Sequence, residues 1–124
     1  MKTSEHVEQF LRFLDDCDEQ FRIAEVELEQ VSAETQDLLH RLELYDDRYH
    51  ETAALAKKLR EVRRRRRVAK DTKTRLEPVV VWYDSHKKEI GAMQRLLGEI
   101  RKIESRQSVR AYVPKTKILE EPNQ

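Results

Sequence analysis

The chain has 124 residues, enough for one domain at most, and 40% of its residues are charged. It holds two glycines and three prolines, all from Pro78 onward, which is too few turn residues for an all-β fold. Its only cysteine is Cys17, so an intramolecular disulfide is excluded. The N-terminus lacks an apolar signal core, and no apolar run approaches the roughly 20 residues of a membrane span. We therefore expect a cytoplasmic protein with no membrane partner.

Charge is distributed unevenly along the chain. Residues 1–56 carry five Lys and Arg against 15 Asp and Glu, net −10, whereas residues 57–118 carry 20 against seven, net +13. Attraction between the two parts favours antiparallel packing of an acidic first helix on a basic second helix. Because the basic excess is the larger, it also leaves a positive surface suited to an anionic partner.

A long first helix is indicated by residues 7–49, which contain no glycine or proline and whose apolar residues recur at spacings of three and four. This heptad pattern predicts a helix to about Tyr45, N-capped by Thr3 or Ser4, with a partner helix along its apolar seam. Only Thr35 interrupts the seam, and Cys17 on it is expected to be a small buried hydrophobe. We assign six seam residues to the partner-helix interface: Val7, Phe10, Leu14, Phe21, Leu28 and Val31.

A turn is predicted at residues 45–49, because Asp46 and Asp47 are poor helix-interior residues. One unbroken helix through residue 77 is the less favoured alternative. The second helix then runs from about residue 48 to 76 and keeps the heptad, although Arg66 and Lys73 occupy seam positions. Pro78 is expected to end or kink it. Residues 79–83 form either a short β strand or a continuation of the helix.

A third helix is predicted over residues 85–105, capped by Asp84 or Ser85. Gly91 and Gly98 share one of its faces, which indicates a close approach of another helix. Its apolar stripe consists of Ile90, Met93, Leu97 and Ile100.

An arm follows the third helix. Val109, Ala111 and Val113 alternate with polar or bulky residues, which is a strand-like pattern. The arm either pairs with its copy in an oligomer, lies along the bundle or stays loose, and residues 120–124 are expected to be disordered.

The predicted fold is all-α: a long antiparallel, coiled-coil-like helical hairpin, a shorter third helix and an extended C-terminal arm. The helical domain covers residues 1–106, and the arm and tail cover 107–124. Because the third helix is expected to cover only part of the first, we predict a homo-oligomer, most simply a dimer.

Patterns for catalysis are absent: the sequence has no Gly-rich phosphate loop, nucleophile elbow or zinc-binding cysteine pattern. We therefore predict a protein that is not an enzyme and has no catalytic residue. Carboxylate and histidine residues do lie three apart in Asp37–His40, His40–Glu43 and Asp47–His50, but off the seam and without the Glu-x-x-His set of a di-iron bundle. We predict no metal and no cofactor.

A basic run, residues 63–67, consists of five successive arginines. Five successive helical residues point around the whole circumference, so two or three share a face and others can pair with the acidic helix. Arginine forks beside aromatic rings suit phosphates and bases, although no named nucleic-acid module is present. The candidate residues for binding nucleic acid or a signalling nucleotide are Arg63, Arg64, Arg66, Arg67, Lys70, Arg106, Arg110 and Tyr112.

Over roughly residues 35–114, short motifs in a fixed order resemble a group of small uncharacterised proteins of phages and prophages of Gram-positive bacteria. The motifs are DLLHRLEL (37–44), LAKKLR (55–60), RRR (64–66), AKD (69–71), LEP (76–78), LG (97–98), RK (101–102) and RAYVP (110–114). The group has no agreed activity, so the resemblance assigns no functional residue. It implies a phage accessory protein in the bacterial host cytoplasm that binds a host component, such as a defence complex, a polymerase, nucleic acid or a signalling nucleotide. A purely structural coiled-coil component is the further alternative.

Overall fold

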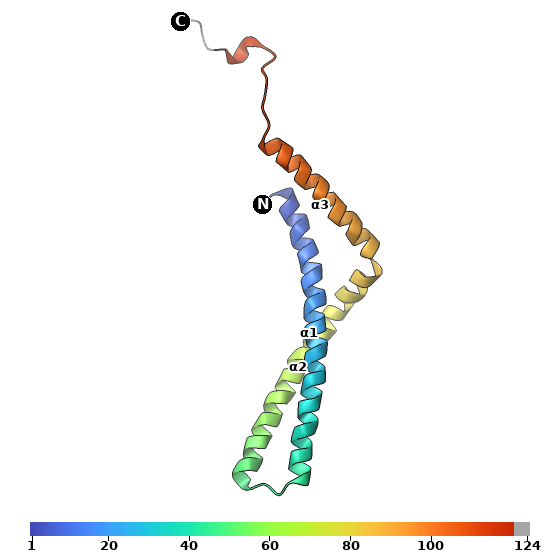
Figure 1. Ribbon diagram of the computed structural model, residues 1–124, viewed down its shortest axis with the longest axis vertical. Helices are drawn as coiled ribbons and strands as arrows, with labels where there is room; N and C mark the ends of the chain where they lie inside the picture. Colours follow the sequence, from blue (N-terminus) through green and yellow to red (C-terminus); the bar gives the residue numbers. More distant parts are fainter. Residues whose placement is uncertain (121–124) are drawn as a thin grey trace.

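The computed structural model describes residues 1–120, which form three long helices and one short 3-10 helix. These are α1 (Thr3–Leu44), α2 (Tyr49–Ser85), α3 (Lys87–Ser108) and η1 (Lys117–Leu119). The all-α prediction is confirmed, and no strand forms within residues 1–120. Helix α2 returns antiparallel along α1, and α3 continues toward the N-terminus (Figure 1). Disorder was predicted for residues 120–124. Of these, residues 121–124 lie outside the described residues.

The predicted turn between the first two helices lies at residues 45–48. Asp47 holds it by accepting two hydrogen bonds from Arg41, at 3.0 Å from Nε and 2.7 Å from Nη2. The Arg41 guanidinium also lies 4.3 Å from the centre of the Tyr45 ring. On the far side of the turn, the Arg48 amide donates to the Glu51 carboxylate at 3.2 Å, which satisfies one amide at the start of α2. The chain therefore reverses through side-chain contacts rather than through a glycine.

Helix α2 continues past Pro78 to Ser85, so the prediction that it ends near residue 76 is wrong, and so is the strand alternative for residues 79–83. A proline inside a helix removes one backbone hydrogen bond and costs about 3 kcal/mol. Burial of Leu76 and Val80 on either side of Pro78, against Cys17 and Phe21 of α1, offsets that cost. Packing on α1 thus overrides the local preference of Pro78.

The joint between α2 and α3 is a single residue, His86. Its Nδ1 lies 2.7 Å from the Trp82 carbonyl oxygen, and its ring stacks on that of Trp82 with centroids 4.4 Å apart. The Ser85 hydroxyl also donates to the carbonyls of the preceding turn, at 2.9 Å for Val81. The expectation that Asp84 or Ser85 caps the third helix is therefore wrong, because both belong to the end of α2.

At the start of α1, Lys2 rather than Thr3 or Ser4 occupies the N-cap position. Its amide donates to the Glu5 carboxylate at 3.2 Å. Ser4 is instead buried, and its amide donates to the Glu104 carboxylate of α3 at 3.1 Å. The N-terminus of α1 is thereby fixed to the C-terminal part of α3.

Most of the apolar seam of α1 is covered within one chain. Val31, Ala24 and Phe21 are buried on the side of α2. Nearer the N-terminus, Leu11 and Leu14 pack with Ile90 and Leu97 of α3. Helices α2 and α3 together cover most of this seam, although Leu28, Leu38 and Leu42 are only half-buried. The homo-oligomer expected from the sequence stays a prediction.

One residue of the predicted interface, Phe10, lies outside the buried face of α1. Phe10 is 42% exposed, and Leu11, one position along, takes its place in the core. The buried face of α1 rotates there because α3 covers a different side of the helix from α2. Cys17 is buried as expected, and this burial, with Asp16 nearby, raises the pKa of its thiol.

The glycines of α3 do not mark a close helix approach, contrary to expectation. A Cβ added at Gly98 would meet no atom within 4 Å, and one at Gly91 would meet only the Arg95 guanidinium at 3.6 Å. Residues 109–120 are all exposed, so the arm does not lie along the bundle (Figure 1). Among residues 1–120, no helix combines the length and apolar character needed to cross a membrane.

Candidate anion-binding site between α1 and α2

Two interruptions of the apolar seam lie opposite one another. Thr35 breaks the seam of α1, Arg66 breaks that of α2, and both line a hollow of about 340 Å³ between the helices. The Thr35 hydroxyl donates to the Val31 carbonyl of its own helix at 2.7 Å, so its oxygen keeps accepting capacity. The other residues that line this hollow are Ser32, Gln36 and Arg63.

A second hollow, of about 500 Å³, adjoins the first because Arg63 lines both. Its apolar surface comes from Leu42 of α1 and from Ala56 and Leu59 of α2. Arginines account for the remaining lining residues: Arg60, Arg63, Arg64 and Arg67. We call the two hollows together the arginine groove.

The charge of the arginine groove is of one sign. Among the described residues that line it there are five arginines and no carboxylate, although the chain contains 24 Asp and Glu. The hollows on the opposite flank of the hairpin do include carboxylates, for example Glu27 and Glu34. A cationic groove beside neutral hydroxyl and amide groups is suited to an anion with several oxygen acceptors.

One arginine of the basic run, Arg65, is paired with carboxylates of the acidic helix α1. Its Nε donates to Glu27 at 2.8 Å and its Nη1 to Glu34 at 2.9 Å. The hydrogen bond to Glu27, supported by the charges of both carboxylates, raises the pKa of Arg65. Arg65 is therefore part of the scaffold that joins α1 to α2.

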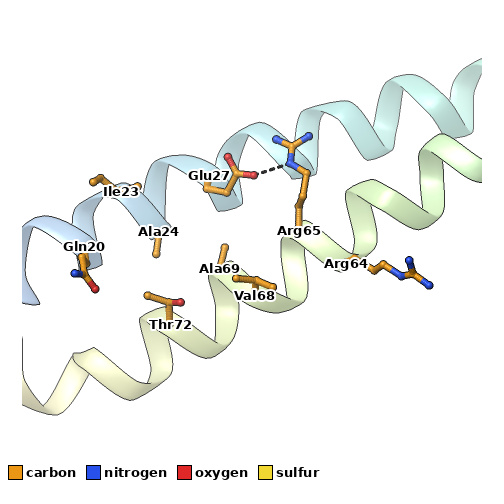
Figure 2. Close-up of a pocket in the computed structure, with 9 residues that line it drawn as sticks. All are labelled: Gln20, Ile23, Ala24, Glu27, Arg64, Arg65, Val68, Ala69 and Thr72. Carbon is orange, nitrogen blue, oxygen red and sulfur yellow. Dashed lines mark hydrogen bonds and ion pairs between the residues drawn. The ribbon is translucent and has the colours of Figure 1, made fainter.

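The other four arginines of the run are exposed, and within residues 1–120 they form no ion pair. Positions 60, 63, 67 and 70 are spaced as i, i+3, i+7 and i+10, so Arg60, Arg63, Arg67 and Lys70 share one side of α2. Arg66 lies next to this stripe, while Arg64 points away from α1 toward solvent (Figure 2). The basic run thus divides into one bridging arginine and four whose charges face the surroundings.

The predicted site residues fall into two separate places. Arg63, Arg64, Arg66, Arg67 and Lys70 all belong to α2. Arg106, Arg110 and Tyr112 lie beyond the point where Glu104 contacts Ser4. On α1 that contact is 23–30 residues from the two partners of Arg65, a distance of roughly 35–45 Å. Within one chain the two groups do not form a common site.

The candidate site residues predicted from the sequence did not include four polar residues of the groove: Ser32, Thr35, Gln36 and Arg60. Their signal was present in the spacing, because Arg60 precedes Arg63 and Arg67 by three and seven positions. Ser32 and Gln36 flank Thr35, the one polar residue of the α1 seam. The His and carboxylate residues near the turn do not gather, and within residues 1–120 no group of three or more potential metal ligands is found.

Comparison of the chain with protein-family models, characterised proteins and solved structures found no match in any of the three. The fold and the geometry of the groove are therefore the basis for the functional proposal. They define a helical hairpin with a third helix and one strongly basic groove.

Proposed function

We propose that this protein acts by binding, without catalysis, and that its ligand is a phosphate-bearing polyanion, foremost nucleic acid, held in the arginine groove. The observation that carries the proposal is that five arginines line the groove and no carboxylate does, in the described part of a chain rich in carboxylates. Guanidinium groups bind phosphate oxygens in bidentate fashion, and Ser32 and Gln36 add neutral donors beside them.

The energetics support a ligand at this place. Like charges that lie close together repel one another and oppose the compact state. Glu27 and Glu34 relieve that repulsion at Arg65 only. A polyanion that neutralises the groove releases its own condensed counterions, and this release favours binding without any sequence preference. The cations form an exposed, extended stripe along α2. This arrangement fits a phosphate backbone better than it fits a single enclosed nucleotide.

The test is fluorescence anisotropy with labelled duplex and single-stranded oligonucleotides between 50 and 300 mM salt. Binding through about four phosphate contacts gives a slope of log K against log salt of about −3.6 for duplex DNA. Replacing Arg63 and Arg67 by glutamine removes about two of these contacts, so we expect a slope smaller by about 1.8 and weaker binding at every salt concentration.

The matched control replaces Arg95 and Lys102 of α3 by glutamine, which changes the net charge equally on a helix outside the groove. This variant is expected to keep the slope of the parent, and circular dichroism checks that both variants fold. Equal effects of the two double substitutions on binding would show a general charge effect. An absence of binding at 50 mM salt would contradict the proposal.

A narrower role is supported by the resemblance to phage and prophage proteins alone: an accessory protein that counters a host defence system through a protein partner. A pull-down from host lysate, with the parent and the Arg63→Gln/Arg67→Gln variant compared, tests it. A partner retained equally by both variants, after nuclease treatment, would favour this role over nucleic-acid binding. A structural coiled-coil component would bind neither.

A further inference from the structure

Another hollow surface lies on the other flank of the hairpin, and this one is apolar. Arg64, on the outer side of α2, lines both it and the arginine groove. It has a volume of about 440 Å³, and its floor consists of the buried Ala24 of α1 and Ala69 of α2. Its walls are formed by Ile23 and Val68, which are 60% and 66% exposed. Figure 2 shows the two helices and the side chains that line it, with the Glu27–Arg65 ion pair at one end. We call it the apolar groove.

The apolar groove has one wall on the acidic helix and one on the basic helix. Glu19 precedes Ile23 by four positions and Arg75 follows Val68 by seven, so each lies on the same face of its helix as that wall residue. Both are exposed, and within residues 1–120 neither forms an ion pair. A surface with one acidic and one basic wall is complementary to itself after a two-fold rotation about an axis parallel to the helices. That rotation places α1 of each copy on α2 of the other, whereas an axis perpendicular to the helices would place acidic helix on acidic helix.

We propose that the apolar groove is the contact between two copies of this chain, related by a two-fold axis that runs along the hairpin. This axis keeps each residue at its own height, so Ile23 of one copy meets Val68 of the other, twice. Glu19 then lies near Arg75 of the other copy. The four helices of the two copies then form a bundle in which each helix is antiparallel to its neighbours, as in a four-helix bundle.

The size of the available surface is sufficient. The paired part of the hairpin is about 40 Å long, and two adjacent helices are about 20 Å wide, so each copy offers about 800 Å². This is the contribution of one partner to an interface of standard size. Phe13, exposed on α1 ten residues before Ile23, adds apolar surface toward the N-terminus. Apart from Arg64, the arginines of the arginine groove do not line this contact, so this inference does not depend on the proposed function.

The first test is the mass in solution by light scattering at tens of micromolar protein. The chain mass is 14.9 kDa, so the dimer is expected at about 30 kDa. Val68→Asp places a carboxylate in the contact and is expected to give a monomer. Val81→Asp is the matched control, because Val81 is 61% exposed on the same helix outside the groove, and this variant should stay dimeric. A monomeric parent, or a dimeric Val68→Asp variant, would overturn the proposal.

The second test distinguishes the two axes. Ile23→Cys and Val68→Cys variants, oxidised separately, should form no disulfide at these positions, because each new cysteine lies across the bundle from its copy. A mixture of the two variants should give a cross-linked heterodimer, since the two positions then meet. Cross-linking of Ile23→Cys alone would support the perpendicular axis instead. Cys17 is common to all samples and buried, and the parent oxidised in parallel accounts for it.

Discussion

Arginines that are adjacent in the sequence have different surroundings in this hairpin. Arg65 and Arg66 are neighbours in the sequence, yet the first is bridged to two carboxylates and the second faces a hollow without any. The cause is the 100° rotation between successive helical positions, which directs one toward Glu27 and the other toward Thr35. The sequence showed that the run must divide, but the carboxylate spacing on α1 selects which arginine pairs, and that depends on the register of the two helices.

Gly98 gives a prediction at this scale. Gly98→Ala should raise the free energy of unfolding by about 1 kcal/mol, because glycine is a poor helix former and an added Cβ meets nothing within 4 Å. Thermal denaturation followed by circular dichroism should show a midpoint higher by a few degrees. A lower midpoint would mean that this face of α3 is covered in solution.

At the scale of the elements, the sequence predicted the existence of all three helices and the position of the turn. It missed the extent of α2, because Pro78 is a strong local signal to stop. Leu76 and Val80 flank Pro78 on the buried face, and their packing on Cys17 and Phe21 is a tertiary effect that periodicity alone does not weigh against the proline. The cap positions were also missed. Ser4 is a residue type typical of N-caps, but its amide donates a hydrogen bond to Glu104 of α3, 100 positions away.

The contact between α1 and α3 is expected to be sensitive to acid. Hydrogen bonds from Ser4 lower the pKa of Glu104 from its ordinary value of 4.5. A carboxyl whose pKa is lower in the folded state stabilises that state above its ordinary pKa, and this contribution is lost as the pH falls through the lowered value. The Ser4 amide belongs to the first turn of α1 and has no partner within the helix, so its protection reports on Glu104.

The measurement is hydrogen exchange of the Ser4 amide by NMR, as a protection factor, between pH 6 and pH 3. Protection should fall over this interval in the parent, whereas Glu104→Gln should show weak protection that does not vary with pH. The amide of Phe21, in the middle of α1, should keep its protection in both. A parent in which Ser4 protection is unchanged at pH 3 would contradict this assignment.

For the whole molecule, the sequence predicted the hairpin and the extended arm but not how α1 is covered. The missing information was the direction of α3: His86 alone joins it to α2, so it continues along α1 and covers Leu11 and Leu14. The separation of the two groups of candidate site residues follows from the same geometry. Periodicity shows which faces of the helices are apolar, but it does not show how far apart their ends lie.

The arm is expected to contribute nothing to the stability of the helical body. Side chains of residues 109–120 are all exposed, so a chain that ends at Ser108 should unfold at the same temperature as the parent, within about 1 °C. Thermal denaturation of both chains at equal concentration is the measurement. A clearly lower midpoint in the shortened chain would show that the arm packs in solution, on its own body or on another copy.

The contact of Ser4 with Glu104 has a mechanical consequence. It places the first turn of α1 and the last turns of α3 at one end of the helical body (Figure 1), with Glu8 and Arg101 3.0 Å apart in the next turn. A force applied between the chain ends therefore acts across the helices and loads these contacts one after another. We expect the molecule to unfold stepwise at low force. Helix α3 is released first, then the C-terminal part of α2, and the Arg41–Asp47 turn last.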